Sequence, residues 1–258
     1  MAVKKNMALL IQYDGSRYDG WQRQGNTDNT IQGRLETVLE KMTGSFQEVH
    51  GSGRTDAGVH ALGQVANVHL NTDMKEEEIC LYLNRYLPED IGILNVKEVP
   101  ERFHSRLLVR EKIYTYWVET GQRCPVFQRK YIYTLGEKPD LEAMREGAGF
   151  LIGTHDFTGF CTSRNKKKSA VRTLKAIEII PHGSQLEFVI TGDGFLYNMV
   201  RIIVGTLIET GLGRRTPRSV AETLEGLDRQ TAGFTAPAKG LFLTKAVYGT
   251  EIFGGDGR

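Results

Sequence analysis

The 258-residue chain has few cysteines, no long apolar run and almost no net charge, and each shortage excludes a class of protein. Its three cysteines, Cys80, Cys124 and Cys161, are far apart, with no CxxC pair and no histidine at metal-ligand spacing. This pattern predicts reduced thiols rather than a disulfide framework or a zinc site.

Membrane and secretion signals are also lacking. No stretch reaches the roughly 18 uninterrupted apolar residues of a membrane span, and residues 1–6 are too short and too polar for a secretory signal. We therefore expect a cytoplasmic protein with no membrane partner. The sequence contains no coiled-coil repeat or other interface signature, so it does not predict an oligomeric state by itself.

The net charge of +2 indicates little by itself, but the cations are unevenly distributed. Four of them lie in Arg164-Asn165-Lys166-Lys167-Lys168, beside Arg172, and a second cluster contains Arg214, Arg215 and Arg218. Such clusters suit phosphate contacts, although charge runs are more often solvated loops.

Hydrophobic periodicity predicts the same order of elements twice. The first set has strands near 9–13, 46–51, 62–70 and 93–99, and helices at 31–42 and 76–86. The second has strands near 112–119, 174–181, 186–192 and 241–248, and helices at 141–151 and 196–210. Each set reads β-α-β-β-α-β, which predicts an α+β protein made of two ferredoxin-like halves. We place the domain boundary near Arg106, giving domains 1–106 and 107–258.

The most informative segment sets one carboxylate and one guanidinium among three glycines, in Gly51-Ser52-Gly53-Arg54-Thr55-Asp56-Ala57-Gly58-Val59-His60-Ala61. Glycine lets the backbone approach a ligand closely, so a large planar substrate could lie against this loop. The segment is not a P-loop, which needs Lys and Ser or Thr after its last glycine, and it lacks the dinucleotide-binding spacing. The alternative interpretation is a tight turn with a surface ion pair.

This segment resembles, almost letter for letter, the signature of tRNA pseudouridine synthases of the TruA family. Segments similar to other family patterns run from near residue 13 to near residue 248. They are Tyr13-Asp14-Gly15, Gly20-Trp21-Gln22, Phe103-His104-Ser105-Arg106, Lys112-Ile113-Tyr114-Thr115-Tyr116, Gly153-Thr154-His155-Asp156-Phe157, Gly194-Phe195-Leu196-Tyr197-Asn198-Met199-Val200-Arg201 and Gly240-Leu241. The resemblance therefore covers nearly the whole chain.

The resemblance implies an isomerase that converts uridine to pseudouridine in the anticodon stem-loop of tRNA, at positions 38 to 40. It implies two halves whose sheets join into one larger, mixed or antiparallel sheet flanked by helices, with the active site in a positively charged cleft between the halves. It also implies a homodimer in which tRNA contacts both subunits. Neither a metal ion nor an organic cofactor is expected.

The isomerisation breaks the C1′–N1 bond of uridine, turns the uracil and rejoins it through C5. A carboxylate suffices, either by covalent attack or by removing the proton at C2′, and Asp56 is the candidate. A carboxylate in a base-binding pocket needs a cation nearby. Arg201 lies in a segment that is apolar round most of a helix, so it must find an anion or extend to the surface. With the resemblance, we predict an ion pair between Arg201 and Asp56.

Eight further residues are substrate-binding or RNA-contacting candidates. Tyr114 and Tyr116 alternate along a strand and share a face, and the resemblance assigns Tyr114 to stacking on the flipped uracil. Arg54 is assigned to base flipping, with pairing to Asp56 or Glu48 as the alternative. Leu241 resembles an apolar pocket residue, although a leucine at the start of a strand is ordinarily core. Loop cations that could contact RNA are Arg17 and Arg23, with Lys166, Lys167 and Lys168.

Two other functions remain open from the residues alone. One is a tRNA-binding or RNA-folding module without catalysis, which would have no need of a desolvated carboxylate. The other is a nucleosidase that hydrolyses the same bond, which would require a second carboxylate to activate water. Asp193 could supply that carboxylate.

Overall fold

The structure is a computed structural model that describes residues 3–25, 27–162 and 169–254. The predicted RNA contacts Lys166, Lys167 and Lys168 therefore lie outside the described residues. By internal packing the chain divides into two units, Met1–Arg110 with Leu243–Arg258, and Glu111–Phe242. Within the described ranges, none of the helices is long and apolar enough to cross a membrane.

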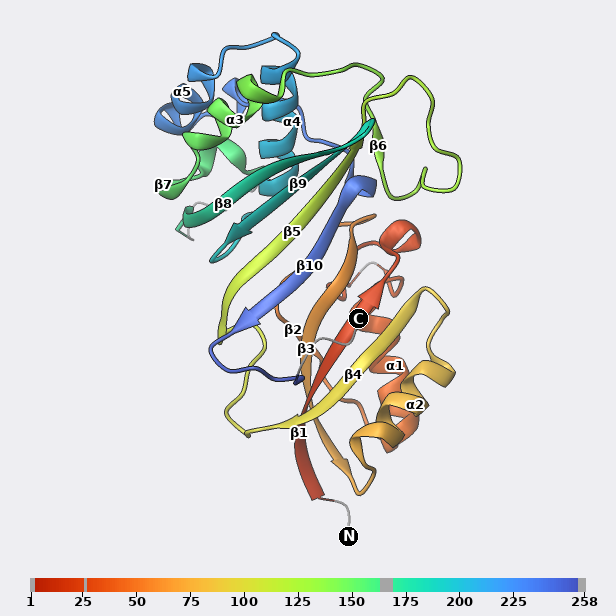
Figure 1. The fold of residues 1–258 in the computed structure, drawn as a ribbon. Helices are drawn as coiled ribbons and strands as arrows, with labels where there is room; N and C mark the ends of the chain where they lie inside the picture. The colour runs from red at the N-terminus through yellow and green to blue at the C-terminus, as the bar shows by residue number, and fades with distance from the viewer. Residues whose placement is uncertain (1–2, 26, 163–168, 255–258) are drawn as a thin grey trace. The chain divides into compact units, whose positions relative to one another are not determined.

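The first unit contains one complete β-α-β-β-α-β set, drawn from red to yellow in Figure 1. Its elements are β1 (Val3–Tyr13), α1 (Ile31–Thr43), β2 (His50–Gly51), β3 (His60–Thr72), α2 (Glu76–Tyr86) and β4 (Ile91–Val99). The strands pair antiparallel in the order β4-β1-β3, and β2 also pairs antiparallel with β3. This is the ferredoxin-like order.

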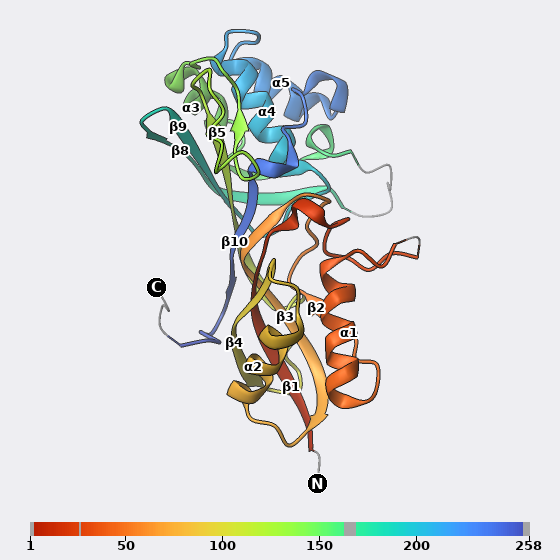
Figure 2. The ribbon, with the colours of Figure 1, turned by 90° about the vertical axis from the view of Figure 1, so that its right-hand side faces the viewer.

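Local signals in the sequence fix the ends of α1. The side chain of Thr30 accepts a hydrogen bond from the amide of Gly33 and caps the first turn, and Gly44 ends the helix with φ 78°. Ile31, Leu35 and Leu39 are fully buried. Figure 2 shows α1 lying alongside the strands of this unit.

The predicted strand at 46–51 is wrong in length, because only His50–Gly51 pairs with β3. Side chains of α1 form the hydrogen bonds of the backbone groups just before this strand. The amide of Val49 donates to the carboxylate of Glu36 (3.2 Å), and its carbonyl accepts from Gln32 (3.2 Å). These side chains take the bonds that a neighbouring strand would otherwise make.

The second set of elements repeats the first. It comprises β5 (Val109–Glu119), α3 (Leu141–Gly149), β8 (Val171–His182), β9 (Gln185–Gly192), α4 (Met199–Gly211) and β10 (Leu241–Tyr248). Its strands follow the order β10-β5-β9-β8, which is again ferredoxin-like. Elements that the sequence did not predict are α5 (Arg218–Gly226), β6 (Tyr133–Thr134) and β7 (Gly153–Asp156).

The strands together form a ten-stranded mixed sheet in the order β4-β1-β3-β10-β5-β9-β8-β7, with β2 beside β3 and β6 parallel to β5. The predicted α+β fold with two ferredoxin-like halves is confirmed.

The predicted helix at 196–210 begins later than expected, at Met199. Asn198 immediately before it has φ 61° and ψ 5°, the left-handed conformation, so the chain turns at this residue. Asparagine tolerates that conformation better than most residues, which explains why the turn precedes the helix.

Candidate active site

The loop that carries Asp56 joins β2 to β3, and its first half is anchored by a buried glutamine. Gln64 on β3 accepts a hydrogen bond from the hydroxyl of Ser52 (2.6 Å) and donates one to the carbonyl of Gly53 (2.8 Å). Both Gln64 and Ser52 are completely buried. The amide of Ser52 also donates to the carbonyl of Val65 (2.7 Å), so this half of the loop is fixed to the central strand.

The second half of the loop is held by the last residue of β1 and by residues that follow this strand. The Tyr13 and Thr55 hydroxyls are hydrogen-bonded (2.8 Å), and the amide of Trp21 donates to the carbonyl of Thr55 (3.0 Å). The amide of Gly58 donates to the carbonyl of Tyr18 (3.3 Å). Thr55, just before Asp56, and Gly58, shortly after it, are therefore both hydrogen-bonded to the segment 13–21.

Two glycines allow these stretches to approach so closely. A Cβ atom on Gly15 would lie 2.0 Å from the carbonyl oxygen of Val59, and one on Gly20 would lie 2.7 Å from that of Thr55. Gly20 also has φ 95°, a conformation that favours glycine. The segments Tyr13-Asp14-Gly15 and Gly20-Trp21 thus support the Asp56 loop.

Asp56 itself is partly buried, whereas Arg54 is exposed. The guanidinium of Arg54 makes no ion pair or side-chain hydrogen bond with any residue that the structure describes. The alternative in which Arg54 pairs with Asp56 or Glu48 is therefore not observed. Glu48 lies instead 3.8 Å from the Nδ1 atom of His50.

Arg201 lies on α4, where nearly every other side chain is buried, as the sequence predicted. Its Nε atom donates to the carbonyl of Ala236 (2.6 Å) and its Nη1 atom to the Oδ1 atom of Asn198 (2.9 Å). These bonds fix the plane of the guanidinium. Its predicted ion pair with Asp56, which belongs to the other unit, stays a prediction.

Tyr114 and Tyr116 both lie on β5 and both rings are buried, in agreement with the predicted alternation. The hydroxyl of Tyr116 donates to the carbonyl of Pro237 (2.7 Å). Burial raises the pKa of Tyr116, and the positive charge of Arg201 partly offsets that rise. Tyr114 meets Phe195 edge to face, with ring centroids 5.0 Å apart.

Leu241 opens β10 and is buried. Asp193, the candidate second carboxylate of a nucleosidase, is exposed and accepts a hydrogen bond from the amide of Thr173 (3.0 Å). Its carboxylate therefore stabilises the start of β8, which gives it a structural function.

Comparison with known proteins decides the family. The family model described as "tRNA pseudouridine synthase" matches residues 9–106 and 148–249. The chain belongs to the tRNA pseudouridine synthase family. It is 50% identical to tRNA pseudouridine synthase A of Bacillus sp. (strain KSM-64) over 92% of this chain and 97% of that protein. It is 48% identical to tRNA pseudouridine synthase A of Clostridium kluyveri, over 95% of this chain and 100% of that protein.

This chain is therefore an isomerase that converts uridine in tRNA to pseudouridine. A solved structure titled "Crystal Structure of a Cbf5-Nop10-Gar1 Complex" aligns over 92% of the synthase and 48% of that chain. The identity is 13% and the TM-score 0.38, a likeness too low to support any argument.

Two of the predicted RNA contacts in the synthase make ion pairs within the chain. Arg17 donates two hydrogen bonds to Asp90, at 3.1 Å and 2.5 Å, although most of its side chain is exposed. Arg23 lies 3.4 Å from the buried carboxylate of Glu36, and its guanidinium lies over the ring of Phe46. RNA contact by either residue stays a prediction.

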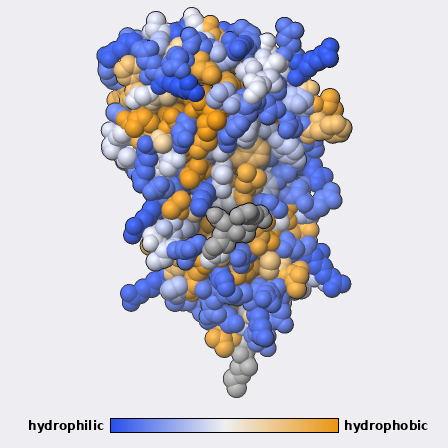
Figure 3. Space-filling model, in the orientation of Figure 1, coloured by the Kyte–Doolittle hydropathy of each residue, from blue (hydrophilic) through white to orange (hydrophobic). Residues whose placement is uncertain are grey.

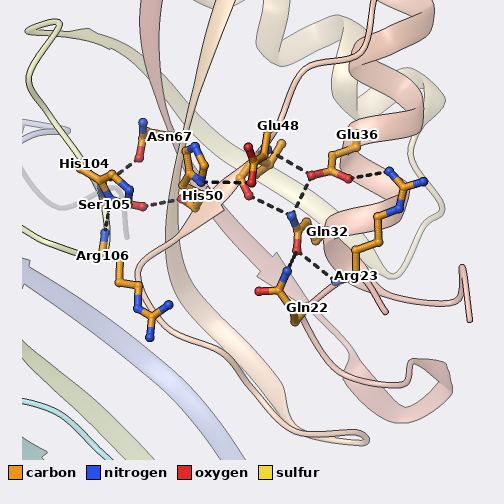
Figure 4. A network of polar contacts seen from close by, with 11 residues as sticks. Gln22, Arg23, Gln32, Glu36, Glu48, His50, Asn67, His104, Ser105 and Arg106 are labelled. Atoms are coloured by element: carbon orange, nitrogen blue, oxygen red, sulfur yellow. Dashed lines mark hydrogen bonds and ion pairs between the residues drawn. The ribbon is translucent and has the colours of Figure 1, made fainter. Parts of the chain in front are cut away.

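Of the residues that support the loop of the synthase, the sequence interpretation quoted Gln22 and Ser105 only as parts of family-like segments, and it did not name Gln64 or Gln32. Figure 4 shows one such network, in which Gln22 and the amide of Arg23 bind Gln32 on α1. On the other side of β2, the hydroxyl of Ser105 donates to the carbonyl of His50, and the rings of His50 and His104 stack at 5.0 Å. Polar residues at inward positions of predicted strands, such as Gln64, were the available signal, because a buried polar group needs a partner.

Proposed function

We propose that Asp56 is the catalytic carboxylate of this synthase and that the target uridines lie in the anticodon stem-loop of tRNA, at positions 38 to 40. The observation that carries this proposal is the support of the Asp56 loop on both sides. Catalysis requires a reacting group held in a narrow range of positions, and the bonds of Ser52, Gly53 and Thr55 provide this.

The chemistry needs a single carboxylate. The C1′–N1 bond breaks, the uracil turns within the site, and a bond forms between C1′ and C5, which then loses its proton. The carboxylate of Asp56 either attacks the substrate covalently or removes the C2′ proton. No net oxidation, reduction or hydrolysis takes place.

The other site residues have complementary roles in the proposal. Arg201 neutralises Asp56, since a desolvated carboxylate without a cation would lose several kcal/mol of hydration. Its guanidinium is already oriented by Ala236 and Asn198. Tyr114 stacks on the flipped uracil, and Leu241 contributes an apolar wall beside it. Both side chains are buried in the free chain, as expected for pocket residues.

Arg54 fills the space that the extruded uridine leaves. Its exposure, and its lack of an ion pair among the described residues, leave the guanidinium available for this function. Base extrusion costs a few kcal/mol, part of which an inserted side chain offsets. The proposal also includes a homodimer in which tRNA contacts both subunits, a cytoplasmic location, and RNA contacts by Arg17 and Arg23.

The test uses unmodified tRNA labelled with tritium at C5 of uridine. Isomerisation at C5 releases the label, so the wild-type chain is expected to release tritium. Asp56→Asn should lower the rate by at least about 100-fold while tRNA binding is kept. Asp73→Asn is the matched control, because Asp73 is an exposed carboxylate beyond the end of β3, and it should behave as wild type.

Two outcomes would contradict the proposal. Tight binding by the wild-type chain with all label retained would identify a non-catalytic tRNA-binding module. Free uracil in the reaction would identify a nucleosidase.

A further inference from the structure

The loop between β5 and β6 presents the most exposed large hydrophobic side chain among the described residues. Phe127 is 95% exposed and its neighbour Val126 is 64% exposed. In Figure 1 the loop runs out beyond β6 as a light green coil. An apolar cluster stands out among polar atoms at the same margin in Figure 3.

Hydrogen bonds of the loop backbone keep these two side chains at the tip of a turn. The amide of Gln128 donates to the carbonyl of Pro125 (3.0 Å), which closes a turn with Val126 and Phe127 at its tip. The guanidinium of Arg129 donates to the carbonyl of Val126 (2.7 Å). The side chain of Gln128 accepts a hydrogen bond from Gln185 on β9 (2.8 Å), so the turn is fixed to the sheet of its unit.

The charge of the loop has one sign. No Asp or Glu occurs between Glu119 and Glu137, whereas Arg123, Arg129 and Lys130 are all exposed. An exposed aromatic ring at the tip of a hydrogen-bonded turn, with cations on both sides of it in the sequence, matches the way proteins bind single-stranded nucleic acid, where rings stack on bases and cations contact phosphates. The established substrate is a polyanion with unpaired bases.

We infer that residues 123–131 form an RNA-contact element in which Phe127 stacks on an unpaired base of the tRNA substrate while Arg123 and Lys130 contact neighbouring phosphates. The inference rests on tRNA being the substrate, and it adds a contact separate from the proposed catalytic residues.

A second copy of the chain is a poorer partner for this loop. Closed dimers bring the same surface patch of both copies together. The loop has no carboxylate to neutralise its cations, so two such loops would repel each other across the symmetry axis. A phosphate backbone supplies the missing negative charge.

The test compares Phe127→Ala with Phe127→Trp, using tritium release from unmodified tRNA together with a direct binding measurement. Phe127→Ala should raise KM and Kd at least about fivefold with kcat unchanged, since stacking on one base is worth about 1–3 kcal/mol. Phe127→Trp should restore wild-type values. Leu81→Ala is the matched control, because Leu81 on α2 is 72% exposed, and it should leave KM unchanged.

A second variant tests the charge. Arg123→Gln should reduce the slope of log Kd against log salt concentration by about 0.7–0.9, the effect of one lost phosphate contact. Wild-type KM and Kd in Phe127→Ala would overturn the inference. So would a lower mass of Phe127→Ala in analytical ultracentrifugation with activity restored at high enzyme concentration, which would identify a self-association surface.

These failures are distinguishable from failure of the proposed function. If the wild-type chain released no tritium, the proposed function would fail, while the Kd values of wild type and Phe127→Ala would still decide whether the loop binds tRNA.

Discussion

At the scale of the residue, Gln64 determines how firmly the Asp56 loop is held. Its amide oxygen and nitrogen bind two successive loop residues, Ser52 and Gly53, and water does not reach it. One side chain therefore fixes the direction in which the chain leaves β2. Both of its partners would lose their hydrogen bonds together if it were replaced.

Gln64→Leu is expected to lower kcat by at least about tenfold with a smaller change in KM, because Asp56 would lose its fixed position while the substrate contacts remain. It should also reduce the free energy of unfolding by about 1–3 kcal/mol, the cost of leaving buried polar groups without partners. The measurements are tritium release and urea unfolding. Gln12→Leu, on an exposed position of β1, is the control.

A KM increase at constant kcat in Gln64→Leu would contradict this assignment, since it would mean that Gln64 supports substrate binding alone.

The residues to which we assign the chemistry could be proposed from the sequence, whereas their supports could be proposed only in part. Asp56 and Arg201 belong to motifs of distinctive composition. Gln64 belongs to none of the motifs, because its importance comes from partners 11–12 residues away along the chain, and the motif that contains Tyr13 does not reveal its partner Thr55, 42 residues away. Only folding brings these pairs together.

At the scale of the element, α4 depends on a glycine in its middle. A Cβ atom on Gly205 would lie 1.9 Å from the carbonyl oxygen of Phe234. The helix can therefore lie directly against the 233–236 segment, whose residue Ala236 accepts the hydrogen bond from Arg201. The orientation of Arg201 thus depends on a close backbone contact one turn further along the helix.

Gly205→Ala is expected to destabilise the chain by about 1–3 kcal/mol or more, since backbone would have to move to accommodate the methyl group. Gly149→Ala, at the end of α3, has no atom within 4 Å of the added Cβ and should be neutral or slightly stabilising. Thermal and urea unfolding of the two variants check this pair. Equal stability of both would show that the helix shifts without cost.

Helices and long strands were predictable because their periodicity extends over several turns or residue pairs. The predicted bounds of α2 and β10 agree with the structure at both ends. β2 was predicted too long because the backbone amide and carbonyl of Val49 are hydrogen-bonded by side chains of α1, a contact between elements that periodicity does not record. The late start of α4 has a similar origin, since it depends on one left-handed residue, Asn198.

At the scale of the whole molecule, the histidines beside β2 make stability depend on pH. Burial lowers the pKa of His104 below its ordinary value of 6.5, and the charges of His50 and Arg106 lower it further. The unfolded chain therefore binds more protons than the folded chain between the lowered pKa and 6.5. The contribution of His104 to the free energy of unfolding therefore falls as the pH drops through that window.

His104→Gln removes the titrating ring and keeps a hydrogen-bond acceptor for the amide of Arg106. The variant should lose less stability than wild type when the pH is lowered from about 7.5 to about 5, a range that spans the ordinary histidine pKa. Urea unfolding at several pH values measures the difference. An equal loss of stability in the variant and in wild type would show that groups other than His104 cause the pH dependence.

The first unit also includes most of β10, which lies far along the chain from β2, and this has a consequence for synthesis of the protein. The hydroxyl of Tyr248 donates to the carbonyl of Ser105 (2.7 Å), and the hydroxyl of Ser105 donates to β2, the strand that leads into the Asp56 loop. A growing polypeptide lacks the hydrogen bond from Tyr248 to Ser105 until residue 248 has left the ribosome. We therefore expect the polypeptide to become fully competent only after residue 248 has been translated, although Asp56, the proposed catalytic residue, is made much earlier.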